Sequence, residues 1–407
     1  MINYQPFPTD VISIVPPRDA PADPSTSLHR LRARFARNDG LPFADVLTEA
    51  RIHDALDEHG VRYRDRIFSP VTTLWGSLSQ VLSDDHSCRD AVTRLIAHRA
   101  AAGLETCSPN TASYCNARGR LPTAVLGSLA KRTARELQAA AAEEWKWNGR
   151  SVFIADGSHV SMPDTPANQA AYPQPPTQEP GLGFPLARVV VLLSLATGAG
   201  HDLAIAPYEG KGTGETTLLR AMYGSLRPGD VVLADSLFDN DFLICELRRR
   251  GIDVVVRAQY DRVGSQVLRD GPDGEILLWR RPNKPHGMTG AQYRLYPEVL
   301  LMRQVTVDAR DKENRAERFQ VVTTILDVSI DGAQIGDLYE RRWEGEVCQA
   351  DDIPRCGLYP SARWAHSERG GAAAPGPLVP GAPSRHRRAD AMRSDSERPV
   401  PPRPRAA

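Results

Sequence analysis

Residues 151–157 read Ser-Val-Phe-Ile-Ala-Asp-Gly, and here the hydrophobic pattern of the chain changes from helical spacing to short apolar runs. A short apolar run that ends at a turn residue is typical of a buried β-strand. Residues 230–236, Asp-Val-Val-Leu-Ala-Asp-Ser, repeat the arrangement. Both stretches therefore predict a buried strand that ends at an aspartate, Asp156 in the first and Asp235 in the second.

The segments around these two runs predict an α/β domain over residues 150–347. Its other elements are expected as strands at residues 187–196, 202–207 and 252–257 and as helices at residues 216–223 and 242–250. The order is three strands, a helix, a strand, a helix and a strand. An RNase H-like mixed sheet would have this order.

Residues 260–318 predict a β-rich insertion within that domain. Its strands are expected at residues 276–280, 292–296 and 299–307. A further strand is expected at residues 319–326, and a helix from about residue 332 through Glu346.

The N-terminal part of the chain predicts a flexible arm, residues 1–27, and then an all-α domain, residues 28–149. Its helices are expected near residues 43–56, 71–82, 91–102 and 121–147, with starts signalled by Ser87, Ser108-Pro109 and Pro122. Basic side chains are frequent here. They could face a DNA backbone, which makes this a candidate DNA-binding domain, or they could form ordinary solvated helix faces.

Composition excludes several classes of protein. The chain has 407 residues and a formal net charge of zero, so a nucleic-acid surface must come from local clustering of charge. Its six cysteines include no Cys-x-x-Cys pair, which argues against structural zinc and a disulfide framework. We expect no signal peptide and no membrane span, because the longest mostly apolar run, residues 189–196, is too short. The expected location is the cytosol.

Residues 348–407 predict a disordered tail. The segment holds ten prolines and ten arginines, no lysine and a single isoleucine, Ile353. Neither helical nor strand periodicity is present. Such a sequence buries too little apolar surface to offset the entropy lost on ordering.

The two strand-end aspartates are candidate metal ligands. In α/β sheets ligands gather at the carboxyl ends of the strands. Mg²⁺ binds through one or two carboxylates and keeps positions open for phosphate oxygens. Two such ions could hold the attacking and leaving oxygens of a phosphoryl transfer. Alone, each aspartate is more often a turn former.

A third element comes from residues 338–346, which read Leu-Tyr-Glu-Arg-Arg-Trp-Glu-Gly-Glu. On a helix Tyr339, Arg342 and Glu346 stand at i, i+3 and i+7 and share one face. The alternative is a salt-bridged amphipathic helix with Trp343 in the core.

Tyr-x-x-Arg-x-x-x-Glu, together with Asp156-Gly157-Ser158 and Asp235, resembles the bacterial transposases of the DDE type, specifically the insertion-sequence-four group. The resemblance covers roughly residues 40–347. It implies that Asp156, Asp235 and Glu346 are the catalytic, metal-binding triad for Mg²⁺, with Mn²⁺ as a possible substitute.

The same resemblance implies that Tyr339, Arg342 and Lys211 contact DNA. The β-rich segment before Glu346 would be the insertion domain of this group. Lys211 lies in Gly-Lys-Gly-Thr-Gly-Glu, residues 210–215, which lacks the spacing of a nucleotide-binding loop. His159 could lie near the metals or be a surface histidine.

The chain departs from the family pattern in two places. Ser236 follows the second aspartate, where many relatives have arginine. Ile353 stands where lysine is expected seven residues after the glutamate, and Pro354 would stop a helix there. A frameshift just after Glu346 accounts for the lost lysine and for the tail composition. A genuine Pro/Arg-rich tail that binds DNA weakly through phosphate charge is the competing interpretation.

The sequence thus predicts a DNA transposase that cleaves element ends and transfers strands, acting on double-stranded DNA as a homodimer. One alternative is a catalytically inactive, truncated or frameshifted DNA-binding remnant. Another is a metal-dependent nuclease of the same fold without a transposon partner.

Overall fold

The structure is a computed structural model, and it describes residues 46–83, 85–179, 181–259, 265–310 and 316–343. All of these residues belong to one compact unit of the chain. The expected arm (residues 1–27), Glu346 and the expected tail (residues 348–407) lie outside the described residues.

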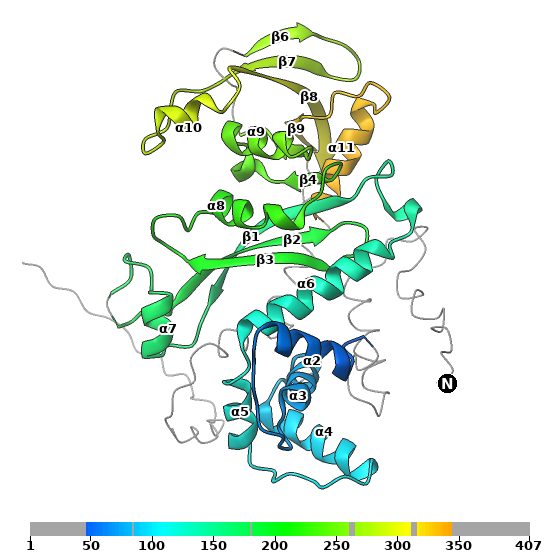
Figure 1. Cartoon of the computed structure of the whole chain (residues 1–407). Coiled ribbons are helices and arrows are strands. Elements are labelled where there is room, and N and C mark those ends of the chain that lie inside the picture. Colours follow the sequence, from blue (N-terminus) through cyan, green and yellow to red (C-terminus); the bar gives the residue numbers. More distant parts are fainter. Residues whose placement is uncertain (1–45, 84, 180, 260–264, 311–315, 344–407) are drawn as a thin grey trace, which may run out of the picture. The chain divides into compact units, whose positions relative to one another are not determined.

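The first part of the described chain is helical, as the sequence predicts (Figure 1). The elements are α2 (Glu49–Glu58), α3 (Pro70–Leu82), α4 (Cys88–Ala101), α5 (Ala112–Arg118), α6 (Thr123–Ala139) and the 3-10 turn η2 (Glu143–Trp145). Ser87 caps α4, because its side chain accepts a hydrogen bond from the backbone N–H of Asp90 at 3.0 Å. Apolar residues of α2, α3 and α6 form one core in this part of the chain.

Two predicted helix boundaries in this part are wrong. Ser108 does not start a helix, because its hydroxyl accepts from Asn110 N–H and the Asn110 side chain accepts from Ala112 N–H, which makes a turn. The expected helix at 121–147 begins after Pro122 but ends at Ala139.

The strands in the described part of the chain form one nine-stranded sheet of order β3-β2-β1-β4-β5-β9-β8-β7-β6. Their bounds are β1 Val152–Ser161, β2 Leu186–Ser194, β3 Gly200–Pro207, β4 Val231–Ala234, β5 Asp253–Arg257, β6 Gln266–Arg269, β7 Glu275–Arg280, β8 Val299–Arg310 and β9 Ala316–Thr323. The strands β1, β4 and β5 are parallel to one another, and the other pairings are antiparallel. The expectation of a mixed α/β sheet is therefore confirmed, and this sheet is consistent with an RNase H-like core.

The first strand is longer than predicted, because it does not end at Asp156. It continues to Ser161, whose partner on the antiparallel strand β2 is Leu186. Its parallel pairing with β4, in contrast, stops at Ala155 and Ala234. One neighbour therefore ends beside Asp156 while the other continues.

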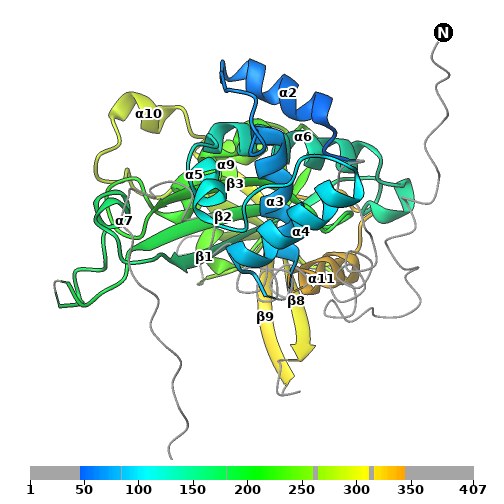
Figure 2. The same ribbon diagram turned by 90° about the horizontal axis from the view of Figure 1, so that it is seen from below.

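The expected β insertion extends the main sheet instead of interrupting it. Strands β6, β7 and β8 join the core through β9, which pairs with β5. Figure 2 shows the ends of β8 and β9 extending together beyond the neighbouring elements. The expected strand at 292–296 is wrong. Residues Gly290–Arg294 form helix α10, which begins with a reciprocal cap between Thr289 and Gln292.

Helices cover both faces of the central strands. The first face packs against α8 (Glu215–Ala221) and α9 (Asp241–Arg249), and the second packs against α11 (Gly332–Glu340). The short elements α7 (Pro166–Ala171), η3 (Tyr223–Ser225) and η4 (Ser236–Phe238) complete the described chain. No helix among the described residues is long and apolar enough to cross a membrane.

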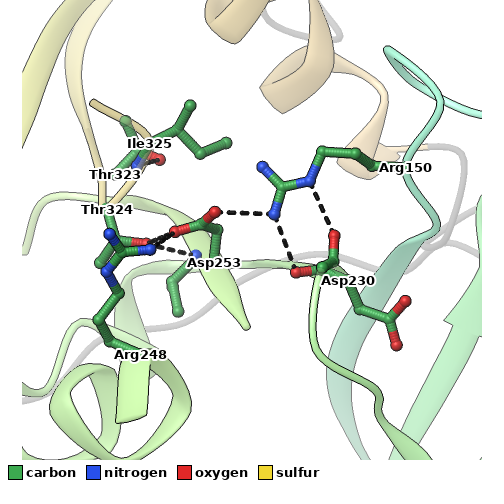
Figure 3. Close-up of polar contacts among 9 residues, drawn as sticks. Arg150, Asp230, Arg248, Asp253, Thr323, Thr324 and Ile325 are labelled. Carbon is green, nitrogen blue, oxygen red and sulfur yellow. Dashed lines mark hydrogen bonds and ion pairs between the residues drawn. The ribbon is translucent and has the colours of Figure 1, made fainter. Parts of the chain in front are cut away.

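A polar network fixes the edge of the sheet where the parallel strands begin (Figure 3). The carboxylate of Asp253 accepts hydrogen bonds from Arg150 at 2.7 Å, Arg248 at 2.8 Å and the hydroxyl of Thr324 at 2.6 Å. Arg150 also donates to the carbonyl of Asp230 at 3.3 Å. The network joins the beginning of β5 to the segments before β1 and after β9.

Candidate active site

Asp156 and Asp235 lie side by side at the other end of the parallel strands, where β1 and β4 stop pairing. Each directly follows the last residue of the parallel β1–β4 pairing, Ala155 opposite Ala234. Neighbouring strands are about 4.8 Å apart, so the two carboxylates arise from adjacent backbone positions. The structure thus brings together the two aspartates that the sequence singled out.

Local hydrogen bonds orient both carboxylates. Asp156 Oδ1 accepts from Gly157 N–H at 2.9 Å, and Asp235 Oδ1 accepts from Leu237 N–H at 2.9 Å. Asp235 caps the short turn η4 in this way. Both residues are half-buried, so their side chains remain partly accessible.

The two aspartates point to the same face of the sheet. Side chains alternate along a strand, so Asp156 lies on the face of Ile154. Asp235 follows β4 in an extended backbone conformation, and continuing the alternation puts it on the face of Leu233. Ile154 and Leu233 belong to the core cluster that contains Leu338 and other residues of α11. The element that leads toward Glu346 therefore covers the face onto which both aspartates project.

Tyr339 and Arg342 pack within this face. Tyr339 is 2% exposed and its ring contacts that of Phe319, while Arg342 is 7% exposed and lies over the Trp343 ring at 4.7 Å. Burial raises the pKa of Tyr339. Tyr339 is the core aromatic of this helix, whereas Trp343 is 39% exposed, so the alternative interpretation that placed Trp343 in the core is wrong. Direct DNA contact by Tyr339 and Arg342 stays a prediction.

Glu215 is a third carboxylate at this place, and the sequence did not single it out. It approaches from the opposite face, where its carboxyl group lies against Gly157 so closely that a Cβ there would overlap it. Burial raises the pKa of Glu215, and the negative charges of Asp235 and Asp156 raise it further, while Arg188 acts in the opposite direction. The three carboxylates are thus close enough to influence one another.

His159 lies on the same face of β1 as Gly157, against which Glu215 packs. His159 is largely exposed on β1, where partial burial of its ring and the charge of Arg188 lower its pKa. Lys211 is exposed in the loop between β3 and α8. The structure does not place either residue against Asp156 or Asp235, and the DNA contact of Lys211 stays a prediction.

The carboxylates suit a divalent cation, although no group of three metal-ligating side chains is arranged for one among the described residues. Hard cations such as Mg²⁺ prefer carboxylate oxygens and need few protein ligands. Burial is the main cause of the raised pKa of Glu215, and the nearby charges of Asp235 and Asp156 add to it; a bound cation would offset those charges. Asp156 and Asp235 would hold such an ion. The expected third ligand, Glu346, lies outside the described residues.

Sequence reasoning missed Glu215 because no local pattern marks it. It belongs to residues 210–215, which drew attention only as a possible phosphate loop. Its neighbour Arg188 lies within the apolar strand at residues 187–196, and nothing in the local sequence distinguishes it from a solvent-exposed arginine. The small residue Gly157 beside a strand-end aspartate was the available signal, since a glycine within a strand often marks a close approach.

A mixed sheet with paired carboxylates after adjacent parallel strands defines a class of α/β proteins suited to metal-assisted phosphoryl transfer. Within this chain, residues 147–347 match the family described as "Transposase DDE domain". The matched residues contain β1, β4, α11 and the segment that leads to Glu346.

The chain is also similar to a protein described as "Putative transposase InsZ" from Escherichia coli (strain K12), with 27% identity over 136 residues. The aligned part is 33% of this chain and 44% of that relative, so the chain spans less than half of the relative's length. The domain match and this likeness together support a transposase.

Proposed function

We propose that the protein is a DDE transposase of the insertion-sequence-four group. It would bind the inverted-repeat ends of its element, hydrolyse one DNA strand there, and join the freed 3′-hydroxyl to target DNA. The observation that carries this proposal is the adjacency of Asp156 and Asp235 on parallel strands, on the face that α11 covers. The family generally uses divalent metal ions, and Mg²⁺, with Mn²⁺ as a substitute, fits the carboxylates.

In the proposed mechanism the protein supplies position and charge. Asp156 and Asp235 would hold the cation, and Glu346, which lies outside the described residues, would complete the set. A bound divalent cation would activate the attacking oxygen and stabilise charge on the phosphate. The backbone N–H groups of Gly157 and Leu237 keep the two aspartates oriented before DNA arrives. In each step one P–O bond forms as another breaks, and the leaving oxygen takes up the proton.

We assign residues 28–149 to DNA binding, residues 150–347 to catalysis and residues 348–407 to a tail. Lys211, Tyr339 and Arg342 are the proposed DNA contacts. Two copies would act together as a homodimer on paired element ends. The protein would work in the bacterial cytosol.

The decisive variant is Asp156→Asn. It keeps the shape of the side chain but removes the charge that holds a cation, so cleavage of DNA carrying the element ends should be abolished. Binding of the same DNA should change little. Ser158→Ala, two residues further along the same strand, is the matched control. Retained cleavage by Asp156→Asn would show that the wrong carboxylate has been assigned.

A second candidate function is a DNA-binding remnant that does not cut. Ile353 in place of the expected lysine and Pro354 directly after it favour this alternative. Translating the DNA beyond codon 346 in the other two frames tests the frameshift. A lysine seven codons beyond the glutamate, within a helical pattern, would support it. Equal cleavage of unrelated DNA would instead support a nuclease without a transposon partner.

A further inference from the structure

Arg188 lies on the opposite face of the sheet from the two aspartates, one strand away. It is paired in register with His159 across the antiparallel strands β1 and β2. By side-chain alternation it shares its face with Val190, which packs in the core under α8. Arg188 is thus on the α8 side of Gly157, whereas Asp156 and Asp235 are on the α11 side.

The guanidinium group of Arg188 is held in place from several directions. Its Nη1 donates a hydrogen bond to the carbonyl of Thr213 at 3.1 Å, and its Cζ lies 5.2 Å from the centre of the Tyr208 ring. Its Nε is 3.5 Å from His159 Nε2 and 3.9 Å from Glu215 Oε1, which are longer contacts. The side chain is 21% exposed, so it is both fixed and accessible.

Glu215 connects this cation to the candidate active site. Its carboxyl group lies against Gly157, the residue next to Asp156, and it also contacts Arg188. A DNA strand whose reactive phosphate lies at Asp156 and Asp235 would therefore have neighbouring phosphates within reach of this side of the sheet. Successive phosphates of one strand lie several ångströms apart, which is the scale of this arrangement.

The chemistry of the group suits phosphate. A guanidinium is planar, always charged at neutral pH, and presents paired N–H donors that match two phosphate oxygens. The contacts of Arg188 with the described residues involve Nη1 and Nε, and those with His159 and Glu215 are long enough to be exchanged for a stronger one. Thr213 and Tyr208 would keep the side chain in place during that exchange.

We propose that Arg188 binds a phosphate of the DNA strand next to the scissile bond, from the α8 face, and so positions that strand against Asp156 and Asp235. The proposal rests on the proposed function, since it needs DNA as the substrate. It adds a phosphate-binding residue to the reaction and identifies the loop of residues 208–214, which contains Tyr208 and Thr213, as its support.

Binding as a function of salt tests the proposal without requiring cleavage. The probe is a short duplex of arbitrary sequence, because a phosphate contact is independent of sequence. Arg188→Gln should weaken binding and reduce the slope of log K against log salt by about 0.9, the value for one lost phosphate contact. Arg188→Lys should keep the slope. Arg220→Gln is the matched control, because Arg220 is paired with Glu246 at 2.6 Å and lies on α8.

Cleavage gives a second and sharper test. Once the cut position of the wild-type protein is mapped, single phosphates around it are replaced by neutral methylphosphonates. At one position, the methylphosphonate should lower the cleavage rate of the wild-type protein as much as Arg188→Gln does. Arg188→Gln acting on that modified DNA should cleave no more slowly than with either change alone. Independent, multiplying losses at every position would overturn the proposal, even if Arg188→Gln also lowers stability.

The outcomes separate the two proposals. If the wild-type chain does not bind DNA, both the proposed function and this inference are wrong. If it binds DNA and Arg188→Gln leaves affinity and salt slope unchanged, only this inference is wrong. Thermal unfolding of each variant identifies a loss of fold. If Arg188→Gln does not fold, Arg188→Lys, which keeps the charge and most of the side chain, replaces it in the methylphosphonate series, and that series then tests the inference.

Discussion

At the scale of single residues, Gly157 allows the carboxyl group of Glu215 to lie against the strand that carries Asp156. A Cβ at this position would overlap the carboxyl group of Glu215, while Asp156 precedes it on the same strand. The atoms that would clash are the far end of a flexible side chain. A larger residue can therefore be accommodated if Glu215 moves away, which makes the glycine important for the site more than for the fold.

We expect Gly157→Ala to lower DNA cleavage by about tenfold or more and the free energy of unfolding by less than about 1 kcal/mol. The displaced Glu215 would lose its place beside Arg188. Cleavage rates and urea unfolding measure the two effects. Gly127→Ala is the control, because a Cβ at Gly127 meets nothing within 4 Å. A large loss of stability with normal activity in the folded fraction would contradict this role.

Asp230 makes a prediction about pH. It is 9% exposed, and burial raises the pKa of its carboxyl group, although it accepts a hydrogen bond from Arg227 N–H at 2.7 Å. A raised folded-state pKa means that the contribution of the group to stability is present below the unfolded pKa. That contribution is lost as pH rises through the folded pKa.

Asp230→Asn keeps an oxygen acceptor for Arg227 and removes the titration. Its stability relative to the wild-type protein should therefore increase as the pH rises from about 4 to 7. Denaturant unfolding at several pH values measures this difference. A constant difference across the range would show that the folded-state pKa of Asp230 is not raised.

At the scale of elements, the sequence predicts the strands of the core well and their ends less well. Val231–Ala234 is apolar on both faces, so its burial can be recognised from composition alone. Asp156 was expected to end its strand, but pairing with β2 extends that strand to Ser161. A long-range partner decides that extension, and no local pattern within β1 reports it.

The candidate site shows the same division. The adjacency of Asp156 and Asp235 follows from two similar local motifs and the parallel order of their strands. Glu215 reaches the site only because the loop before α8 brings it against Gly157, and that is a property of tertiary packing. The prediction of a strand at residues 292–296 was wrong for a local reason, because the Thr289 cap favours a helix there.

The network in Figure 3 allows a prediction about the sheet edge where β1, β4 and β5 begin. Asp253 has a side chain that is 11% exposed and is shared by Arg150, Arg248 and Thr324. Asp253→Ala would leave the half-buried Arg150 without this carboxylate. We expect a loss of about 3 kcal/mol in the free energy of unfolding.

Chemical denaturation measures that loss, and Asp308→Ala is its control. The side chain of Asp308 is 77% exposed and lies 3.6 Å from Arg318, so its removal should cost less than about 1 kcal/mol. Equal losses for the two variants would mean that the network at Asp253 adds no more than a surface ion pair does.

At the scale of the whole described chain, α6 joins the helical part to the sheet. Lys131 pairs with Asp202 at 2.8 Å, and the side chain of Asp202 is 2% exposed. Gln138 donates to the hydroxyl of Ser151 at 3.0 Å and accepts from that of Ser194 at 2.5 Å. These polar contacts across a partly buried boundary couple the stability of the two parts.

We therefore expect the helices and the sheet to unfold in one transition, even if residues 28–149 bind DNA as a separate functional domain. Hydrogen exchange should give similar opening free energies for peptides from α3 and β4. Lys131→Met leaves the buried carboxylate of Asp202 without its cation, and should lower both values together by about 2–3 kcal/mol. Lys146→Met, which removes a contact with the exposed Glu143, is the control.

If α3 opened at a much lower free energy than β4, and Lys131→Met changed only one of the two opening free energies, the helical part would be an independently folding domain. Its DNA-binding role could then be tested in isolation.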